Sequence, residues 1–454
     1  MVFYALLLAD PTTEMMICWI DETGNGTDHT IYYGEDKENL NNSQTVSGVE
    51  MIEGDGYVYS TSLKELNSDV TYHLEVDTGS FISEIESFKT FPQTLGDKSI
   101  KLMTLPDIHI NQGYTHNWEN PDKIDRFVEE NPDIIIIPGD GTGQGDVHER
   151  FVSAFKDYFS QFNSEHLTPI LWCPGNHEMG GWVDPADNED DLDERHYPYF
   201  VPNLAEIDPV GRGLFYGNIV IGDYLQLVAL DSHGVVGEWQ DQVNWIKTLT
   251  DNANKSFAIH HRGYIHNEGK IYHRSSDVEI PFIDYVTNTT FNEDRKDDKY
   301  QVWQREDWFV NLYNGLENLE GFFTGHIHGG AVTRPLKPVE YTPDTPYYLP
   351  AGEYNLVRDD EEGVREYGQG FRGIGSSLYH ERQLKELLEA SIPNSGYSFH
   401  IVEIFQEDYE IVNHSYNVNT GERYIIWHKD WEEEIKQELK AVQEKKKLLS
   451  IFFD

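Results

Sequence analysis

Short runs of alternating hydrophobic and polar residues fill the first 95 positions of the chain. Glycine, asparagine and aspartate separate these runs, which lie at residues 3–9, 14–20, 29–34, 56–63, 71–78 and 86–92. A period of two is typical of strands with one buried face, and closely spaced turn signals are typical of a β-sandwich. The pattern therefore predicts a separate all-β sandwich over residues 1–95.

From residue 96 onward, continuous apolar runs alternate with stretches whose hydrophobic residues recur at helical spacing. Helices are expected near residues 120–128, 151–162, 239–246, 376–393 and 431–447. Alternation of strands and helices indicates β-α-β crossovers. The pattern predicts an α/β domain over residues 96–430, followed by a C-terminal helix and tail over residues 431–454.

The predicted C-terminal helix would be amphipathic. It would carry Ile435, Leu439 and Val442 on one face, and a short apolar segment follows it. An apolar end of this kind is expected to dock onto the body of the protein or onto a second copy. A homo-oligomer held through this helix is therefore one of two expected arrangements.

Seven side chains of metal-ligand type lie where apolar runs end. They are Asp107, His109, Asp140, Asn176, His260, His326 and His328. An apolar run of four to eight residues bounded by glycine or proline is typical of a buried strand. In open α/β sheets, the loops that leave the carboxyl ends of the strands build the site. We therefore expect these seven side chains to gather at one edge of a sheet.

This set of donors suits a pair of first-row divalent metals. Carboxylate, carboxamide oxygen and imidazole bind Zn, Mn, Fe or Ni, and the absence of cysteine from the set favours an open catalytic centre over a closed structural one. Two ions about 3.5–4 Å apart can activate a bridging water as hydroxide and hold the oxygens of a phosphate during in-line attack. Phosphoester hydrolysis is the reaction that such a pair serves best.

Five short motifs occur in one order across this region: D-x-H at residues 107–109, G-D at 139–140, G-N-H-E at 175–178, H-H at 260–261 and G-H-x-H at 325–328. In this order and spacing they resemble the calcineurin-like metallophosphoesterases. The resemblance implies two packed sheets flanked by helices, an αββα arrangement. The strands of residues 1–95 also resemble the fibronectin type III-like module that precedes the catalytic domain in purple acid phosphatase-like proteins.

The resemblance also implies a role for each motif residue. Asp107, His109 and His328 would hold one metal, Asn176, His260 and His326 the other, and Asp140 would bridge them. His177 would be the acid that protonates the leaving group. A histidine suits this role because its reference pKa near 6.5 lets it supply a proton near neutral pH.

Local geometry refines some of these roles. His260 and His261 would face opposite ways in a strand, so only one can be a direct ligand, and the family pattern selects His260. His261 then becomes a neighbour of the ligands or a substrate contact. Glu178 is expected to orient a neighbouring side chain, as is Asp231 at the end of another apolar run. Gly175 is expected to adopt a positive φ that lets the next two side chains reach the cleft.

Two features qualify the resemblance. Purple acid phosphatases carry a tyrosine three residues after the G-D aspartate, whereas Gly143 stands at that position here. A purple Fe(III) centre is therefore not expected, although phosphoesterase activity is.

Long insertions at residues 179–213 and 262–302 directly follow metal-ligand motifs and can select substrate. Arg262 is placed to meet an anionic phosphate, but a solvated loop would also contain such a residue.

Composition narrows the partners and the location. The chain has 454 residues, with 34 Lys and Arg against 80 Asp and Glu, which gives a net charge of −46. This strongly acidic balance would repel nucleic acid and anionic membranes. Only Cys18 and Cys173 occur, no signal peptide is visible at the start, and no apolar run is long enough to span a membrane. A cytoplasmic protein acting on a small phosphorylated substrate is expected.

The sequence thus predicts a dimetal phosphoester hydrolase that prefers monoesters and uses a metal-bridging hydroxide. One alternative is a cyclic-nucleotide or other small phosphodiesterase, which would differ in the loops over the site. A second alternative, from another class, is a non-catalytic metal-binding interaction module. The intact set of seven ligand-type residues favours the enzyme.

Overall fold

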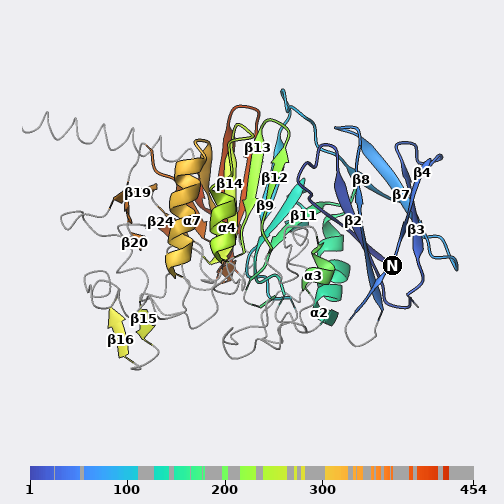
Figure 1. The fold of residues 1–454 in the computed structure, drawn as a ribbon, viewed down its shortest axis with the longest axis horizontal. Coiled ribbons are helices and arrows are strands. Elements are labelled where there is room, and N and C mark those ends of the chain that lie inside the picture. The colour runs from blue at the N-terminus through green and yellow to red at the C-terminus, as the bar shows by residue number, and fades with distance from the viewer. Residues whose placement is uncertain are drawn as a thin grey trace, which may run out of the picture.

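Two large sheets and a few helices make up most of the described structure (Figure 1). Their buried side chains form two hydrophobic cores. The computed structural model describes residues 1–24, 26–51, 56–110, 127–142, 148–163, 165–175, 177–178, 197–202, 215–231, 239–262, 270–273, 278–281, 302–325, 331–333, 335–340, 349–351, 354–358, 362–368, 370–371, 388–391, 396–417 and 423–428. Within this part of the chain, no helix is both long and apolar enough to cross a bilayer.

The N-terminal part contains two groups of antiparallel strands. Its strands are β1 Val2–Leu6, β2 Met15–Asp21, β3 His29–Gly34, β4 Asn42–Val46, β5 Val49–Glu50, β6 Tyr57–Leu63, β7 Thr71–Asp77 and β8 Glu86–Lys89. One group is a four-stranded sheet in the order β4-β3-β7-β8, and the other places β1, β2, β6 and β5 side by side. The predicted strands are confirmed. The additional strands β4 and β5 are short and mostly polar, and so show no hydrophobic alternation.

The N-terminal part shares a sheet with the rest of the molecule. Strand β1 pairs in parallel with β11 (Pro169–Cys173), with Ala5 opposite Pro169 and Leu6 opposite Ile170. The sheet continues through β10 (Ile134–Pro138) to β9 (Ile100–Thr104), and ends in the antiparallel strands β25 (Gly396–Ile404), β26 (Tyr409–Asn417) and β27 (Arg423–His428). Main-chain hydrogen bonding therefore crosses the predicted domain boundary near residue 95.

A seven-stranded sheet packs against this first sheet. Its order is β12 (Gly217–Ile221), β13 (Leu225–Ala229), β14 (Ser256–Arg262), β17 (Leu319–Gly325), β22 (Arg365–Gly368), β18 (Ala331–Thr333) and β24 (Leu388–Ser391). Successive residues of its central strands enter different cores. Leu227 and Phe257 join the core shared with the first sheet, whereas Val228 and Ala258 pack on the helix side. Because successive side chains of a strand point to opposite faces of the sheet, each central strand contributes to both cores.

Helices cover the outer faces of both sheets. Helices α4 (Trp239–Ile246) and α7 (Val302–Gly315) lie together on the seven-stranded sheet (Figure 1), and Val243 and Leu312 enter the second core. On the first sheet, a helical segment runs through α2 (His148–Ser153), the π-helical η2 (Ala154–Tyr158) and the 3-10 turn η3 (Phe159–Phe162). The helices predicted around 151–162 and 239–246 are confirmed.

The remaining elements are short. They are α3 (Tyr197–Phe200), the hairpin of β15 (Lys270–His273) and β16 (Val278–Pro281), the small sheet of β19 (Leu336–Glu340), β20 (Leu349–Ala351) and β21 (Tyr354–Arg358), and β23 (Gly370–Phe371). One predicted helix is wrong at its end. The pattern predicts a helix near residues 376–393, but Leu388 begins β24, which pairs with β18. Sheet pairing here overrides a leucine-rich pattern of high helix propensity.

Two further predicted helices fall largely outside the described residues. Only the end of the helix expected near residues 120–128 is described, and there Phe127 is buried against Phe399 of β25. The helix expected at residues 431–447, with its proposed contact to a second copy, lies entirely outside the described part of the chain.

Candidate metal centre

The candidate residues lie in loops at the carboxyl ends of neighbouring strands. Asp107 and His109 follow β9, Asp140 follows β10, and His177 follows β11, while His261 lies near the end of β14. Because β9, β10 and β11 are parallel neighbours, their ends meet at one edge of the sheet. The structure brings these five side chains together, each buried or nearly so.

Backbone hydrogen bonds join the first two loops. The amides of Asp107, His109 and Ile110 donate to the carbonyl oxygens of Gly139, Asp140 and Gly141, at 3.1, 3.0 and 3.0 Å respectively.

The same loops hold three non-glycine residues in the left-handed region. They are Asp107, His109 and Asp140, with φ of 50°, 51° and 52°. Such conformations cost about 1–3 kcal/mol each and persist only where the surroundings impose them, most often at functional sites. Here the backbone hydrogen bonds between the two loops hold the three residues in this conformation.

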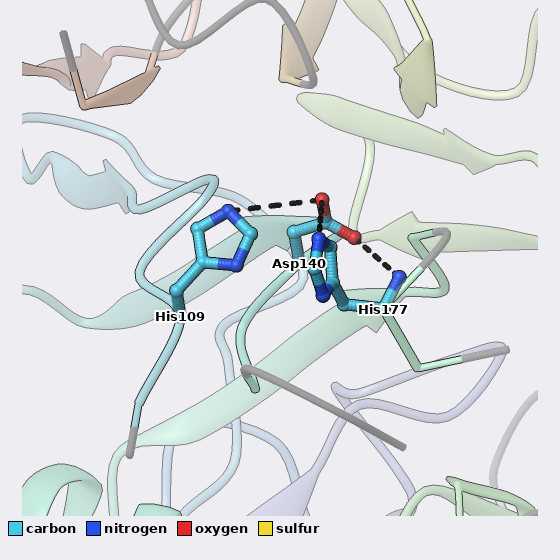
Figure 2. Close-up of side chains that lie close together, drawn as sticks. All are labelled: His109, Asp140 and His177. Carbon is cyan, nitrogen blue, oxygen red and sulfur yellow. Dashed lines mark hydrogen bonds and ion pairs between the residues drawn. The ribbon is translucent and has the colours of Figure 1, made fainter. Parts of the chain in front are cut away.

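Asp140 lies beside both His109 and His177 (Figure 2). Its Oδ2 atom lies 3.1 Å from Nε2 of His261, 3.8 Å from Nε2 of His109 and 3.9 Å from Nε2 of His177. Its Oδ1 atom accepts a hydrogen bond of 2.8 Å from the backbone amide of His177. The rings of His109 and His177 meet edge to face, with centroids 4.5 Å apart. One carboxylate thus faces three imidazoles.

These side chains form two groups of potential ligands that share Asp140. One contains His109, Asp140 and His177, and the other Asp107, Asp140 and His261, with the ligand atoms of each group within 4.8 Å of one another. Asp107 also borders the first group, because its Oδ1 lies 4.0 Å from Nε2 of His109. Two bonds of about 2.1 Å to one ion leave their donor atoms about 3–4 Å apart, so the spacing suits bound metal.

The close approach of these charged groups shifts the pKa values of Asp140 and His261. Burial by itself raises the pKa of Asp140, but the charge and hydrogen bond of His261, together with the charges of His109 and His177, hold that pKa well below its usual range. Burial lowers the pKa of His261, and the charge and hydrogen bond of Asp140 reverse this and raise it to about 9. The cluster therefore favours an ionised carboxylate beside imidazoles that can exchange a proton for a cation.

Of the two neighbouring histidines, His261 is the one with described contacts to Asp140. His261 points to Asp140 with Nε2, while its Nδ1 lies 2.9 Å from the carbonyl oxygen of Pro138, which accepts from Nδ1–H. His260 is also buried, but its ring packs towards Phe322 in the helix-side core. A register shift between Ile259 and Arg262 marks the irregular end of the strand. The described contacts thus join His261 to Asp140, and metal binding by His260 or by His261 stays a prediction.

Motif glycines are required by close contacts. A Cβ on Gly175 would overlap Oδ1 of Asp140, and one on Gly325 would lie 2.7 Å from Oδ2 of Asp107. The expected positive φ at Gly175 is wrong, because that residue has no left-handed backbone and is needed for its lack of a side chain. Both glycines let a neighbouring strand end approach a carboxylate of the cluster.

The other candidates are absent from the two groups of described ligand atoms or lie outside the described residues. Asp231 is buried at the end of β13, where its carboxylate accepts a hydrogen bond of 3.3 Å from the amide of Phe215. Its backbone N–H and C=O are both bound by the side chain of Gln242, at 2.9 and 3.0 Å. Asn176, His326 and His328, and the side chain of Arg262, lie outside the described residues.

The structure adds two residues that the motifs did not indicate. Trp172, on β11, lies directly beneath Gly141, where a Cβ would overlap its indole ring. Thr142 donates both its amide and its hydroxyl to Glu178, at 2.9 and 3.2 Å. The "GTG" run after Asp140 gave no signal for this contact, since it depends on a residue 36 positions away.

Comparison with known proteins bears on the fold. Residues 3–90 match the family described as the purple acid phosphatase N-terminal domain. No curated protein sequence matches the chain significantly. The structure is similar to purple acid phosphatase PPD1 from yellow lupin (Lupinus luteus) seeds, with 13% identity, a TM-score of 0.58, and coverage of 94% of this chain and 73% of that one.

A second similar structure is that of PhoD. Identity is 11% and the TM-score is 0.57, and the match covers 94% of this chain and 91% of that one. At such low identity the likeness concerns the fold. The predicted resemblance is confirmed at that level: residues 3–90 match the purple acid phosphatase N-terminal domain family, and the chain is similar in fold to the structures of purple acid phosphatase and PhoD, which are both calcineurin-like metallophosphoesterases.

Proposed function

We propose that this chain is a dimetal-dependent phosphoester hydrolase that acts on small phosphomonoesters. One observation carries the proposal: the buried carboxylate of Asp140 belongs to both groups of ligand-type side chains at the strand ends. A shared carboxylate is what a pair of metal ions needs as a bridge. We further propose that the two packed sheets are those of an αββα metallophosphoesterase, preceded by a fibronectin type III-like sandwich.

The donor chemistry fits such a centre. All described members are carboxylates or imidazoles, whereas the thiols of Cys18 and Cys173 are buried within strands, with Sγ of Cys173 directed at the carbonyl oxygen of Ile259. Fe, Zn, Mn or Ni would suit this set. Two bound ions would supply the Lewis acidity that activates water and offsets charge on the phosphoryl oxygens.

The ligand assignment that we propose combines motif and geometry. Asp107 and His109 would serve one ion together with His328. His261 would serve the other, together with Asn176 and His326, in the place first given to His260. Asp140 would belong to both.

His177 is proposed as the acid for the leaving group. Its side chain is 12% exposed, against 6% for His109 and none for His261, so it is the member of the cluster most open to a substrate. Its backbone amide is held by Asp140, which fixes where the ring can reach. From this position it can give a proton to the departing alcohol.

The decisive experiment measures metal content and hydrolysis on the same preparation. We expect about two transition-metal ions per chain and faster turnover of p-nitrophenyl phosphate than of its bis-ester. Asp140→Ala should lose more than about tenfold in kcat, which is about 1.4 kcal/mol of barrier.

The matched control is Asp251→Asn. Asp251 accepts two backbone amides at 3.0 and 3.1 Å, like a structural carboxylate, but lies before β14 at the opposite end of that strand from the cluster. This variant should keep wild-type activity. Faster turnover of the bis-ester would indicate a diesterase, and less than one ion per chain without hydrolysis would indicate a non-catalytic interaction module.

A further inference from the structure

The carboxylate of Glu178 is completely buried beside the cluster. Its Oε2 atom accepts the backbone amides of Asp140 and Gly175, both at 2.7 Å. Its Oε1 atom accepts the amide of Thr142 at 2.9 Å and the hydroxyl of the same residue at 3.2 Å. The side chain therefore receives four donors from two loops.

Four donors fill the capacity of a carboxylate. Each oxygen offers about two lone-pair directions, so an ionised carboxyl group accepts about four hydrogen bonds. On Glu178 every one of these directions is used by the protein. These four donors leave no free acceptor direction for a metal ion. The contacts thus argue against a role as a metal ligand.

The contacts join two turns that come from different strands. Asp140 and Thr142 follow β10, whereas Gly175 and Glu178 follow β11. The second turn returns a hydrogen bond, because the amide of His177 donates to Oδ1 of Asp140 at 2.8 Å. The missing side chain of Gly175 lets the two turns touch. Each turn therefore fixes the other.

This reciprocal contact acts on a strained residue. Asp140 has a φ of 52°, a conformation that must be imposed by its surroundings. Its amide is bound by Glu178 on one side, and its carbonyl oxygen accepts the amide of His109 at 3.0 Å on the other. Both peptide groups that flank the Asp140 side chain are thus held.

We propose that Glu178 is a positioning residue that holds Asp140 in the conformation in which its carboxylate can serve two ions at once. The inference rests on the proposed function and adds to it the group that shapes the bridge. Glu178→Gln tests it with little change in volume. A carboxamide keeps one acceptor oxygen but turns two N–H donors towards backbone amides that also donate.

The probe is Mn²⁺ alone, titrated into the full-length metal-free chain while free Mn²⁺ is followed by EPR. We expect the wild type to bind two ions, and Glu178→Gln to bind at least one of them 10–100-fold more weakly, as changes behind a metal ligand typically do. The kcat for p-nitrophenyl phosphate should fall by a similar factor while KM changes less than about threefold. Added Mn²⁺ should restore part of the loss, which a globally unfolded variant would not show.

Two further variants guard against misfolding. Asp251→Asn, which disturbs a carboxylate that binds backbone amides elsewhere, should bind two ions as the wild type does. Thr142→Val removes only the hydroxyl donor and should weaken Mn²⁺ binding by about two- to fivefold in the same direction.

The outcomes separate the two proposals. If Glu178→Gln binds two ions with the wild-type affinity, the positioning role is overturned and the hydrolase proposal stands. If Glu178→Gln does not fold, unchanged affinity in Thr142→Val leads to the same conclusion. A wild-type chain that binds no Mn²⁺ and no other transition metal would overturn both.

Discussion

Nε2 of His261 lies 3.1 Å from Oδ2 of Asp140, and the structure shields both side chains from solvent. The residue before it in the chain, His260, packs on the other side of the same strand, towards Phe322. Among the described contacts, His261 therefore reaches the carboxylate of Asp140, whereas His260 packs on an aromatic ring. The difference makes their roles experimentally separable.

Replacement of these two histidines should give opposite results. His261→Ala is expected to lose at least about 100-fold in kcat/KM, or about 2.7 kcal/mol, because it removes an imidazole beside Asp140, the carboxylate that we propose as the bridge. His260→Gln should keep most of the activity and should lower the free energy of unfolding by about 1–3 kcal/mol, because the buried ring that packs on Phe322 is lost. Steady-state kinetics and urea unfolding of both variants provide the measurement. Loss of activity in His260→Gln alone would restore His260 as the ligand.

Gly175→Ala should damage the site through a single methyl group. The added Cβ would overlap Oδ1 of Asp140, so either the carboxylate or the turn must move. We expect kcat to fall by at least about tenfold, since displacements of about 1 Å at a reacting centre are costly. Gly315→Ala is the control, because nothing lies within 4 Å of that position. Equal activity in both variants would contradict the close contact.

Leu6→Ala should destabilise the entire chain. Leu6 is fully buried in β1, opposite Ile170 of β11, and truncation of such a core leucine costs about 2–5 kcal/mol. Because the sheet is continuous, we expect one cooperative thermal transition that shifts as a whole in calorimetry. Val49→Ala, at a site that is 48% exposed, should change stability by less than about 0.5 kcal/mol. Two separate transitions, with only the first one shifted, would show that the two parts unfold independently.

Low pH should reduce the folding stability of the N-terminal part, because His29 becomes protonated. Burial lowers the pKa of this histidine, and the carboxylates of Asp21, Asp28 and Asp77 offset part of that effect. Its Nδ1 accepts the indole N–H of Trp19 at 3.1 Å, a bond that a proton on Nδ1 would break. A folded pKa below the unfolded value means that the unfolded chain binds more protons. Stability is therefore retained above pH about 6.5 and falls as pH drops below it.

His29→Gln tests this pH dependence. Glutamine keeps an acceptor for Trp19 but has no charge to gain, so unfolding in urea between pH 5 and pH 7.5 should vary less than in the wild type. His73→Gln, at a half-buried position of β7, should retain the wild-type trend. An unchanged slope in His29→Gln would remove His29 from the explanation.

Apolar runs that end at a polar residue allowed the buried strands to be predicted from the sequence. A parallel strand that is buried on both faces is apolar at nearly every position. Residues 134–137 are four consecutive isoleucines, and they form β10 with Asp140 at its end. By contrast, Leu388 lies in a leucine-rich stretch whose partner strand β18 decides its conformation. Local pattern contains no information about that partner.

The candidate site, too, could be predicted from the sequence only in part. Motif order selected Asp107, His109, Asp140 and His177, which the structure brings together. Which of His260 and His261 faces them depends on the phase of β14 against its neighbours, and this is set by packing. The four hydrogen bonds of Glu178 likewise join turns that become neighbours only when β10 pairs with β11.

Parallel pairing of β1 with β11 has a consequence for biosynthesis. During translation β1 emerges long before β11, and at about 5–20 residues per second the interval is on the order of ten seconds. Throughout that time one side of β1 presents unsatisfied amides and carbonyls, the kind of open edge that recruits other strands. A fragment ending at residue 95 should accordingly self-associate on gel filtration, and a strictly monomeric fragment would show that the nascent sandwich protects this edge by itself.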